Sequence, residues 1–242
     1  MASPFSLGDY LYAHRGLWSK DGPPENSLAA FHTAANAGFG MEFDVRLSAD
    51  GVPVCFHDAD LKRMAGQDDI VADCTADTLS KIKLAGTNET IPTLSDLLEI
   101  WPHHLPLLAE IKAQDTPPVP AAEAVSALLS SYTGRAAAMS FSEEAVAALP
   151  KTLPRGLLIA SIEDTGRGAF DRGLATALDL QVDYLSVWYG DAAEASPFAR
   201  KHGLGLVVWT VSSPEDFAAS APHVDAQIFE NFDPVASLAR TD

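Results

Sequence analysis

Short apolar runs alternate along this chain with alanine-rich stretches of helical periodicity, and this alternation constrains the fold more than any other feature. Strands separated by helices form parallel sheets, because a parallel connection requires a crossover. Nine runs are typical of strands, at residues 10–13, 41–47, 52–56, 106–111, 137–141, 156–160, 184–188, 205–211 and 226–229. Helices are expected at residues 27–37, 94–101, 121–131, 142–149, 168–178, 192–202, 214–219 and 235–240. The pattern predicts an α/β fold.

The second and third strands lie too close in the chain to be parallel neighbours. The pair Asp50-Gly51 between them is a strong hairpin signal. With these two residues as the loop, residues on the two strands lie opposite each other when their numbers sum to 101. Asp44 is then opposite His57. With this hairpin counted as an extension of strand 2, eight parallel strands remain, the number in a TIM barrel. We therefore expect a (β/α)8 barrel with a β-hairpin extension of strand 2 and a small insertion after it.

The length of 242 residues fits one barrel domain, so we expect residues 1–242 to form a single domain. Residues 58–90 are polar and weakly periodic, with one short helix near residues 76–84. We expect them to be a small insertion over the barrel mouth, which acts either as a lid or specificity element or as an ordinary surface connection.

Charge and composition exclude several classes of partner. The formal net charge is −17, from 33 acidic and 16 basic residues, which argues against nucleic acid or an anionic membrane as a partner. Cys55 and Cys74 do not make a disulfide framework. No run approaches the roughly 18 apolar residues of a membrane span, and the N-terminus does not resemble a signal peptide. We expect a soluble, cytoplasmic protein without stable membrane association, of unknown oligomeric state.

Five ionisable residues lie at or just beyond the C-terminal ends of apolar runs: His14, Glu42, Asp44, His57 and Glu110. Ionisable groups are rarely buried unless they are paired or bind a metal. A single one would be better explained as a surface residue at a strand end. The whole set instead predicts one shared site that contains a cation.

The spacing of the acidic residues favours a hard cation. Glu42 and Asp44 are two residues apart, so their side chains share one strand face, and Glu110 and Lys112 have the same relation on another strand. Three carboxylates from two strands suit Mg²⁺ or Ca²⁺ better than zinc. The sequence also lacks the histidine and cysteine spacings of zinc sites.

The basic residues near the same strand ends suit the chemistry of a phosphate ester. His14 and His57 can divide the roles of general acid and general base. Arg15 and Lys112 can bind a phosphate. Because Arg15 directly follows His14, a turn at Gly16 has to bring the arginine inward for this role.

The chain resembles the glycerophosphodiester phosphodiesterase family over nearly its whole length. Each motif is weak alone, but their order and spacing are specific. The motifs are His14-Arg15-Gly16, Pro24-Glu25-Asn26-Ser27, Gly40-Met41-Glu42-Phe43-Asp44-Val45, Asp50-Gly51, Val54-Cys55-Phe56-His57-Asp58 with Leu61 and Arg63, Ile91-Pro92-Thr93-Leu94, Glu110-Ile111-Lys112, Ser140-Phe141 and Val208-Trp209-Thr210-Val211.

The resemblance implies a TIM barrel that hydrolyses glycerophosphodiesters to glycerol 3-phosphate and an alcohol. It implies that Glu42, Asp44 and Glu110 bind one divalent cation, Mg²⁺ or Ca²⁺, and that His14 and His57 are the acid–base pair. In this family the substrate's own glycerol hydroxyl attacks the phosphorus and forms a cyclic phosphate. A metal-bound water is the alternative nucleophile, and the sequence does not separate the two routes.

By the same resemblance, Arg15 and Lys112 hold the phosphate of a small-molecule substrate, and Trp209 packs against its glycerol moiety. The chain departs from the family at the last strand, which usually reads Asp-Gly-Ile-Ile-Thr-Asp. Here residues 225–230 read Asp-Ala-Gln-Ile-Phe-Glu. We expect this change to alter the eighth loop without touching the metal or proton-transfer residues.

Two other functions are compatible with a barrel of this kind. A lysophospholipase D-type hydrolase would need an apolar groove near Trp188, Trp209 and the insertion. A catalytically silent barrel that binds a phosphorylated ligand predicts the loss of a histidine or a metal carboxylate, and all five are present.

Overall fold

The computed structural model describes residues 7–114 and 116–235, and it contains the predicted eight-stranded parallel barrel. Parallel pairing between the first and last strands closes the barrel. Around it the strands follow the order β1 (Tyr12–His14), β2 (Gly40–Leu47), β4 (Leu107–Ile111), β5 (Ala136–Ser140), β6 (Arg155–Ile159), β7 (Tyr184–Trp188), β8 (Gly205–Val211) and β9 (Ala226–Phe229).

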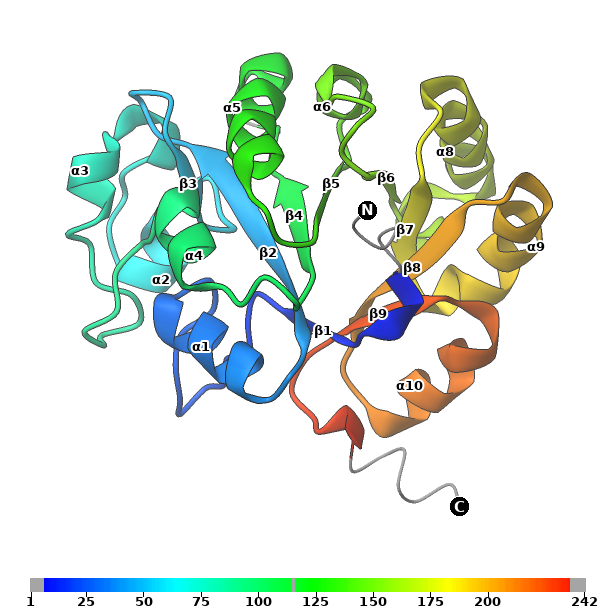
Figure 1. Cartoon of the computed structure of the whole chain (residues 1–242), viewed down its shortest axis with the longest axis horizontal. Coiled ribbons are helices and arrows are strands. Elements are labelled where there is room, and N and C mark those ends of the chain that lie inside the picture. Colours follow the sequence, from blue (N-terminus) through cyan, green and yellow to red (C-terminus); the bar gives the residue numbers. More distant parts are fainter. Residues whose placement is uncertain (1–6, 115, 236–242) are drawn as a thin grey trace.

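The connecting helices surround the barrel (Figure 1). They are α1 (Leu28–Asn36), α4 (Leu94–Ile100), α5 (Pro118–Ser131), α6 (Glu143–Ala148), α8 (Arg167–Leu180), α9 (Ala192–His202) and α10 (Pro214–Ser220). The hydroxyls of Ser27, Ser142 and Ser213 accept hydrogen bonds from backbone N–H groups in the first turns of α1, α6 and α10. The short helix α7 (Ile162–Thr165) was not expected, and the helix expected at 235–240 lies almost wholly outside the described residues.

The hairpin after strand 2 is present, but the predicted register is wrong by one residue. β3 (Pro53–Cys55) runs antiparallel to β2, and paired residues have numbers that sum to 100. The residue opposite Asp44 is therefore Phe56, whose N–H donates to the Asp44 carbonyl, and not His57. The loop contains three residues instead of two, and it ends at Gly51 in the left-handed conformation (φ 77°).

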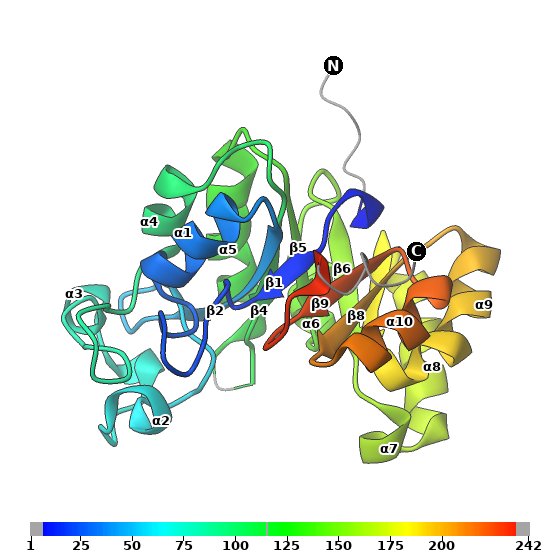
Figure 2. The same ribbon diagram turned by 90° about the horizontal axis from the view of Figure 1, so that it is seen from below.

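The segment after the hairpin packs beside the barrel, next to β2 and β3. It contains α2 (Lys62–Ala65), the 3₁₀ turn η2 (Val71–Asp73) and α3 (Ala76–Leu79), and Figure 2 shows α2 and α3 beyond α1 on one flank of the barrel. A separate apolar cluster holds this segment against β3: Val54, Phe56, Leu61, Met64, Val71, Leu79, Ile82, Leu84 and Ile91.

Two further apolar clusters form the barrel's core. The larger lies between the strands and the surrounding helices, and the smaller fills the barrel interior with residues that include Tyr12, Leu108, Met139, Tyr184 and Val207. No helix in the described part of the chain combines the length and the apolar character that crossing a membrane requires.

Candidate active site

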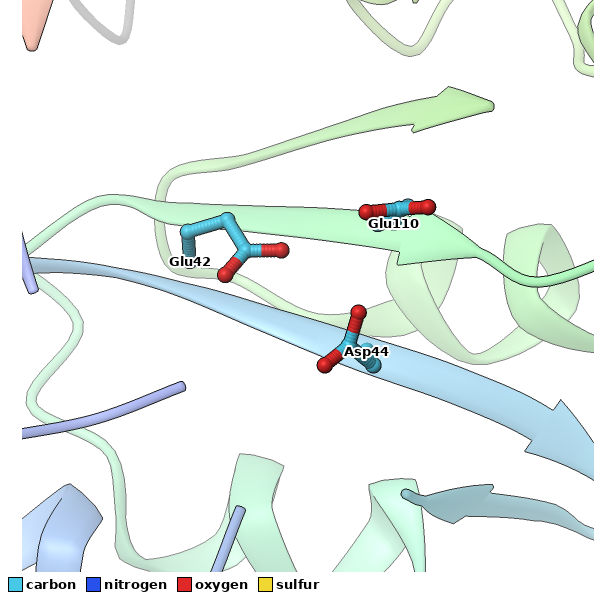
Figure 3. A group of neighbouring side chains, drawn as sticks. All are labelled: Glu42, Asp44 and Glu110. Carbon is cyan, nitrogen blue, oxygen red and sulfur yellow. The ribbon is translucent and has the colours of Figure 1, made fainter. Parts of the chain in front are cut away.

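Three buried carboxylates lie together inside the barrel. Glu42 and Asp44 come from β2 and Glu110 from β4, and Figure 3 shows the three side chains on neighbouring strands. The parallel register sets Asp44 directly beside Glu110. One oxygen from each carboxylate lies within 4.8 Å of the others, and their exposed fractions are 1%, 0% and 8%. The structure thus brings together the three acidic residues that the strand spacing selected.

Two cations balance part of this negative charge. Lys112 Nζ lies 2.6 Å from Glu110 Oε1 and 3.1 Å from Asp44 Oδ1, and Arg15 Nε lies 3.0 Å from Asp44 Oδ2. Burial alone would raise the pKa of Asp44, but Lys112 and Arg15 hold that pKa well below its usual range. Asp44 is therefore the carboxylate of the three that is most firmly ionised.

The other two carboxylates have raised pKa values. Burial, followed by the charges of Asp44 and Glu110, raises the pKa of Glu42 well above its ordinary value. Burial is also the main cause of the raised pKa of Glu110, although Lys112 opposes it. Without added positive charge the site does not favour three ionised carboxylates at once. Oxygen donors in this arrangement can hold a metal ion, which would relieve this repulsion.

A tight turn after β1 carries Arg15 into the site, as the sequence argument required. Arg15 itself adopts a left-handed conformation (φ 56°), and Gly16 follows at φ 82°. A Cβ on Gly16 would lie 2.9 Å from the carbonyl carbon and the Cβ of Ala30, so only glycine fits here. The Arg15 N–H donates to Glu42 Oε2 at 3.2 Å, and its guanidinium donates to Glu25 Oε1 at 2.9 Å.

Asn26, from the motif Pro24-Glu25-Asn26-Ser27, also belongs to the site. Its Nδ2 donates to Asp44 Oδ2 at 2.9 Å, and its Oδ1 accepts from the Asp44 N–H at 3.2 Å. Ser27 is the actual cap of α1. Asn26 is buried and left-handed (φ 54°), so its amide fixes the orientation of Asp44.

The altered residues of the last strand and the loop after it include one that contacts His14, so the expectation that the change leaves the proton-transfer residues untouched is wrong. His14 Nδ1 lies 2.7 Å from Glu230 Oε2, in the loop directly after β9. Barrel closure explains the contact, because β1 pairs with β9 one residue earlier, at Ala13 and Phe229. His14 Nε2 lies on the other side, 3.9 Å from Glu42 Oε2. The residue at the altered position of the last strand thus contacts a predicted proton-transfer residue.

The second histidine has the same kind of partner. His57 Nδ1 lies 2.6 Å from Asp58 Oδ1, and Arg63 Nε donates to Asp58 Oδ2 at 2.7 Å. Arg63 also donates to both oxygens of Glu25, which links this pair to Arg15. Asp58 and Arg63 belong to the sequence motifs, but no role was inferred for them. Burial is the main cause of the lowered pKa of His57.

The predicted site residues line one cavity of about 200 Å³. Both histidines, Arg15, Glu42, Glu110 and Lys112 form its polar side, and Asp44 lies directly beneath, in contact with Lys112. Trp209 lies on the opposite wall, where its ring packs edge-on against Phe141 at 5.7 Å. Trp188, which is paired with Trp209 across β7 and β8, is not among the residues that line this cavity.

Comparisons with known proteins identify the family of the chain. The Glycerophosphoryl diester phosphodiesterase family model matches residues 14–231. Glycerophosphodiester phosphodiesterase 1 of Bos taurus is 26% identical, over 88% of this chain and 74% of that protein. A glycerophosphodiester phosphodiesterase structure from Thermotoga maritima superposes with a TM-score of 0.78 at 29% identity, covering 96% of this chain and 98% of the other.

A second solved structure supports the fold. A phosphodiesterase from Oleispira antarctica, solved in complex with the product sn-glycerol-3-phosphate, has a TM-score of 0.81 at 23% identity, over 95% of this chain and 96% of that one. The family match over residues 14–231 includes every residue of the site described above. The chain therefore belongs to the glycerophosphoryl diester phosphodiesterase family.

Proposed function

We propose that this chain hydrolyses glycerophosphodiesters to glycerol 3-phosphate and an alcohol, as a single-domain enzyme of the cytoplasm. The observation that carries the proposal is the pair of histidines beside three buried carboxylates in one cavity, each histidine with its Nδ1 next to a further carboxylate. Family membership supports the same reaction class.

Glu42, Asp44 and Glu110 are the proposed ligands of one divalent cation, Mg²⁺ or Ca²⁺. Their buried oxygen donors, close spacing and unfavourable mutual charge fit a hard cation. When bound, the ion supplies positive charge and Lewis acidity for the phosphoryl oxygens. The chain's own contribution is to fix the ligands, and Asn26 does this for Asp44 through two hydrogen bonds.

Arg15 and Lys112 are proposed to bind the phosphate. Both side chains pair with Asp44 and also line the cavity. A phosphate in the cavity could therefore contact both cations. Charge on the phosphate oxygens increases in the transition state, and fixed cations in a sheltered cavity stabilise it there. On the opposite wall, Trp209 is proposed to pack against the glycerol moiety.

His14 and His57 are proposed to move the protons. Each has its Nδ1 held by a carboxylate, which leaves Nε2 for the reacting oxygens. One imidazole takes the proton of the attacking hydroxyl, and the other gives a proton to the alcohol oxygen as its bond to phosphorus breaks. If water attacks, this one step yields glycerol 3-phosphate. If the substrate's glycerol hydroxyl attacks, it yields a cyclic phosphate, and water then opens the ring with the roles of the two histidines exchanged.

The cavity size argues against the lysophospholipase D alternative. A volume of about 200 Å³ suits a glycerol-sized group, whereas drug-sized ligands occupy pockets of about 300–1,000 Å³. A retained acyl chain would need an additional apolar channel beside Trp209. The proposed substrate is therefore a deacylated glycerophosphodiester.

The proposal is tested by measuring glycerol 3-phosphate release from glycerophosphocholine and glycerophosphoethanolamine. The protein is assayed as purified, with EDTA, and with Mg²⁺ or Ca²⁺ added back after EDTA. We expect release that EDTA abolishes and one of the cations restores. Release that EDTA leaves unchanged would contradict the metal site, and no release from either substrate would contradict the reaction.

A further inference from the structure

Two hollows meet at the reacting centre. The first is the cavity of about 200 Å³ described above, and the second is a groove of about 610 Å³ between strand 2 and the insertion. His57 and Lys112 line both. If the phosphate binds at Lys112, as proposed above, its two ester arms can extend in two directions, one into each hollow.

The two hollows differ in size and in chemistry. The cavity has an apolar wall that includes Phe141, Leu158, Trp209 and Ile228, and it has room for a small arm. The groove is larger, and Ala59 is the only apolar residue among those that line it. A glycerol arm fits the cavity, so the alcohol that leaves is directed to the groove.

The groove is rich in positive charge for so acidic a chain. The whole sequence has 33 acidic and 16 basic residues, but in this groove cations outnumber carboxylates by four to two. The cations are Arg46, Lys62, Arg63 and Lys112, and the carboxylates are Asp58 and Asp60. Such a lining favours hydroxyl and anionic groups over cationic or hydrocarbon ones.

Two of the cations that line the groove are held by other groups of the protein, and one is available to a ligand. Arg46 Nε donates to the His57 carbonyl at 2.8 Å, and Arg63 is bound by both Asp58 and Glu25. Lys62 differs, because its side chain is 63% exposed and its partner Asp68 is 87% exposed. An ion pair between two exposed side chains is weak, so the Lys62 ammonium can turn to a ligand at little cost.

We propose that this groove binds the leaving alcohol and selects alcohols that carry negative charge, with Lys62 as a specificity-determining residue. The inference rests on the proposed hydrolysis and adds the class of alcohol. It explains the position of the insertion, because α2 contributes Lys62 and Arg63 to the groove directly beside His57.

The test compares three substrates with the same glycerophosphoryl half and different leaving alcohols. Glycerophosphoinositol 4-phosphate has an anionic alcohol, glycerophosphoinositol a neutral one of the same shape, and glycerophosphocholine a cationic one. We expect kcat/KM of the wild-type chain to decrease in that order. Lys62→Glu should lower the ratio of the anionic to the neutral substrate by about fivefold, the size of effect that reversing one partly exposed charge produces.

Lys81→Glu is the matched control. Lys81 also lies in the insertion, is 70% exposed and pairs with an exposed aspartate, but it does not line the groove. It should leave the ratio unchanged, and an equal effect of both variants would overturn the proposal, as would a wild-type preference for glycerophosphocholine. If the wild type releases glycerol 3-phosphate from none of the three, the proposed hydrolysis itself fails.

Discussion

The two halves of the barrel mouth differ in the side chains that their strands present. On one half, β1, β2 and β4 supply His14, Glu42, Asp44 and Glu110. On the other half, β5, β6, β8 and β9 supply mainly apolar groups: Met139, Leu158, Trp209 and Ile228. One scaffold thus separates the groups that do the chemistry from the groups that shape the cavity.

The apolar half also affects the charged half. Aliphatic and aromatic side chains opposite the carboxylates reduce the water in the cavity, and charges interact more strongly where water is excluded. Substitutions on the charged half should therefore reduce turnover, whereas substitutions on the apolar half should change substrate binding.

The largest effect is expected from removing a histidine. His14→Ala and His57→Ala should each lower kcat by about 10²–10⁴-fold, because each removes one proton-transfer group. Turnover of a glycerophosphodiester and thermal unfolding are measured together. His32→Ala, at an exposed position on α1, is the matched control and should retain full activity. Near wild-type rates in both active-site variants would contradict the assignment of proton transfer to these two histidines.

A smaller effect is expected from replacing Glu230, the carboxylate next to His14 Nδ1. Glu230→Gln keeps the size of the side chain but removes the charge 2.7 Å from His14 Nδ1. We expect kcat to fall about 10–100-fold, the range seen when a group that orients a functional side chain is lost. Glu144→Gln, on the exposed face of α6, is the control. Unchanged activity in Glu230→Gln would show that the loop after β9 does not contribute to proton transfer.

The pH dependence of activity tests whether His57 is the general base of the pair. Burial lowers the pKa of His57, so this imidazole stays neutral at lower pH than usual, and the hydrogen bond that its Nδ1–H donates to Asp58 opposes the shift. If His57 is the base, activity falls as the pH drops through its pKa. Asp58→Asn removes the opposing effect, so the acid limb of kcat/KM should move to lower pH. A shift to higher pH would contradict this reasoning.

The smallest effect is expected on the apolar half. Trp209→Phe removes an indole whose ring packs against Phe141 and whose buried N–H has no partner within the described protein. We expect KM to rise about two- to tenfold with kcat nearly unchanged, because an aromatic contact of this kind contributes modestly to binding. A decrease in kcat larger than the increase in KM would show that the apolar half takes part in the chemistry.

The sequence predicted the barrel and the carboxylate cluster because both follow from short-range periodicity. Glu42 and Asp44 share a face through a spacing of two residues, and the hairpin left a count of eight strands. The predicted hairpin register was wrong for a local reason. The signal at Gly51 fits loops of two or three residues, and a shift of one residue changes the partner of Asp44.

Contacts between distant segments could not be read in the same way. Glu230 and His14 are 216 positions apart in sequence and meet because β9 pairs with β1. Extending that pairing by one residue beyond Phe229 would have placed Glu230 opposite His14. Asparagine and serine both suit a helix cap, and only the folded chain shows that Ser27 caps α1 while Asn26 contacts Asp44.

The most direct test of the account is a titration of Mg²⁺ and Ca²⁺ into the metal-free protein, followed by thermal unfolding. A ligand that binds only the folded chain raises the melting temperature with its concentration. We predict such a rise for the wild-type chain and little or none for Glu42→Gln, which should be at least as stable without cation because it removes an acidic group whose ionisation burial and the charges of Asp44 and Glu110 disfavour. No rise in the wild type, or an equal rise in Glu42→Gln, would contradict the carboxylate site.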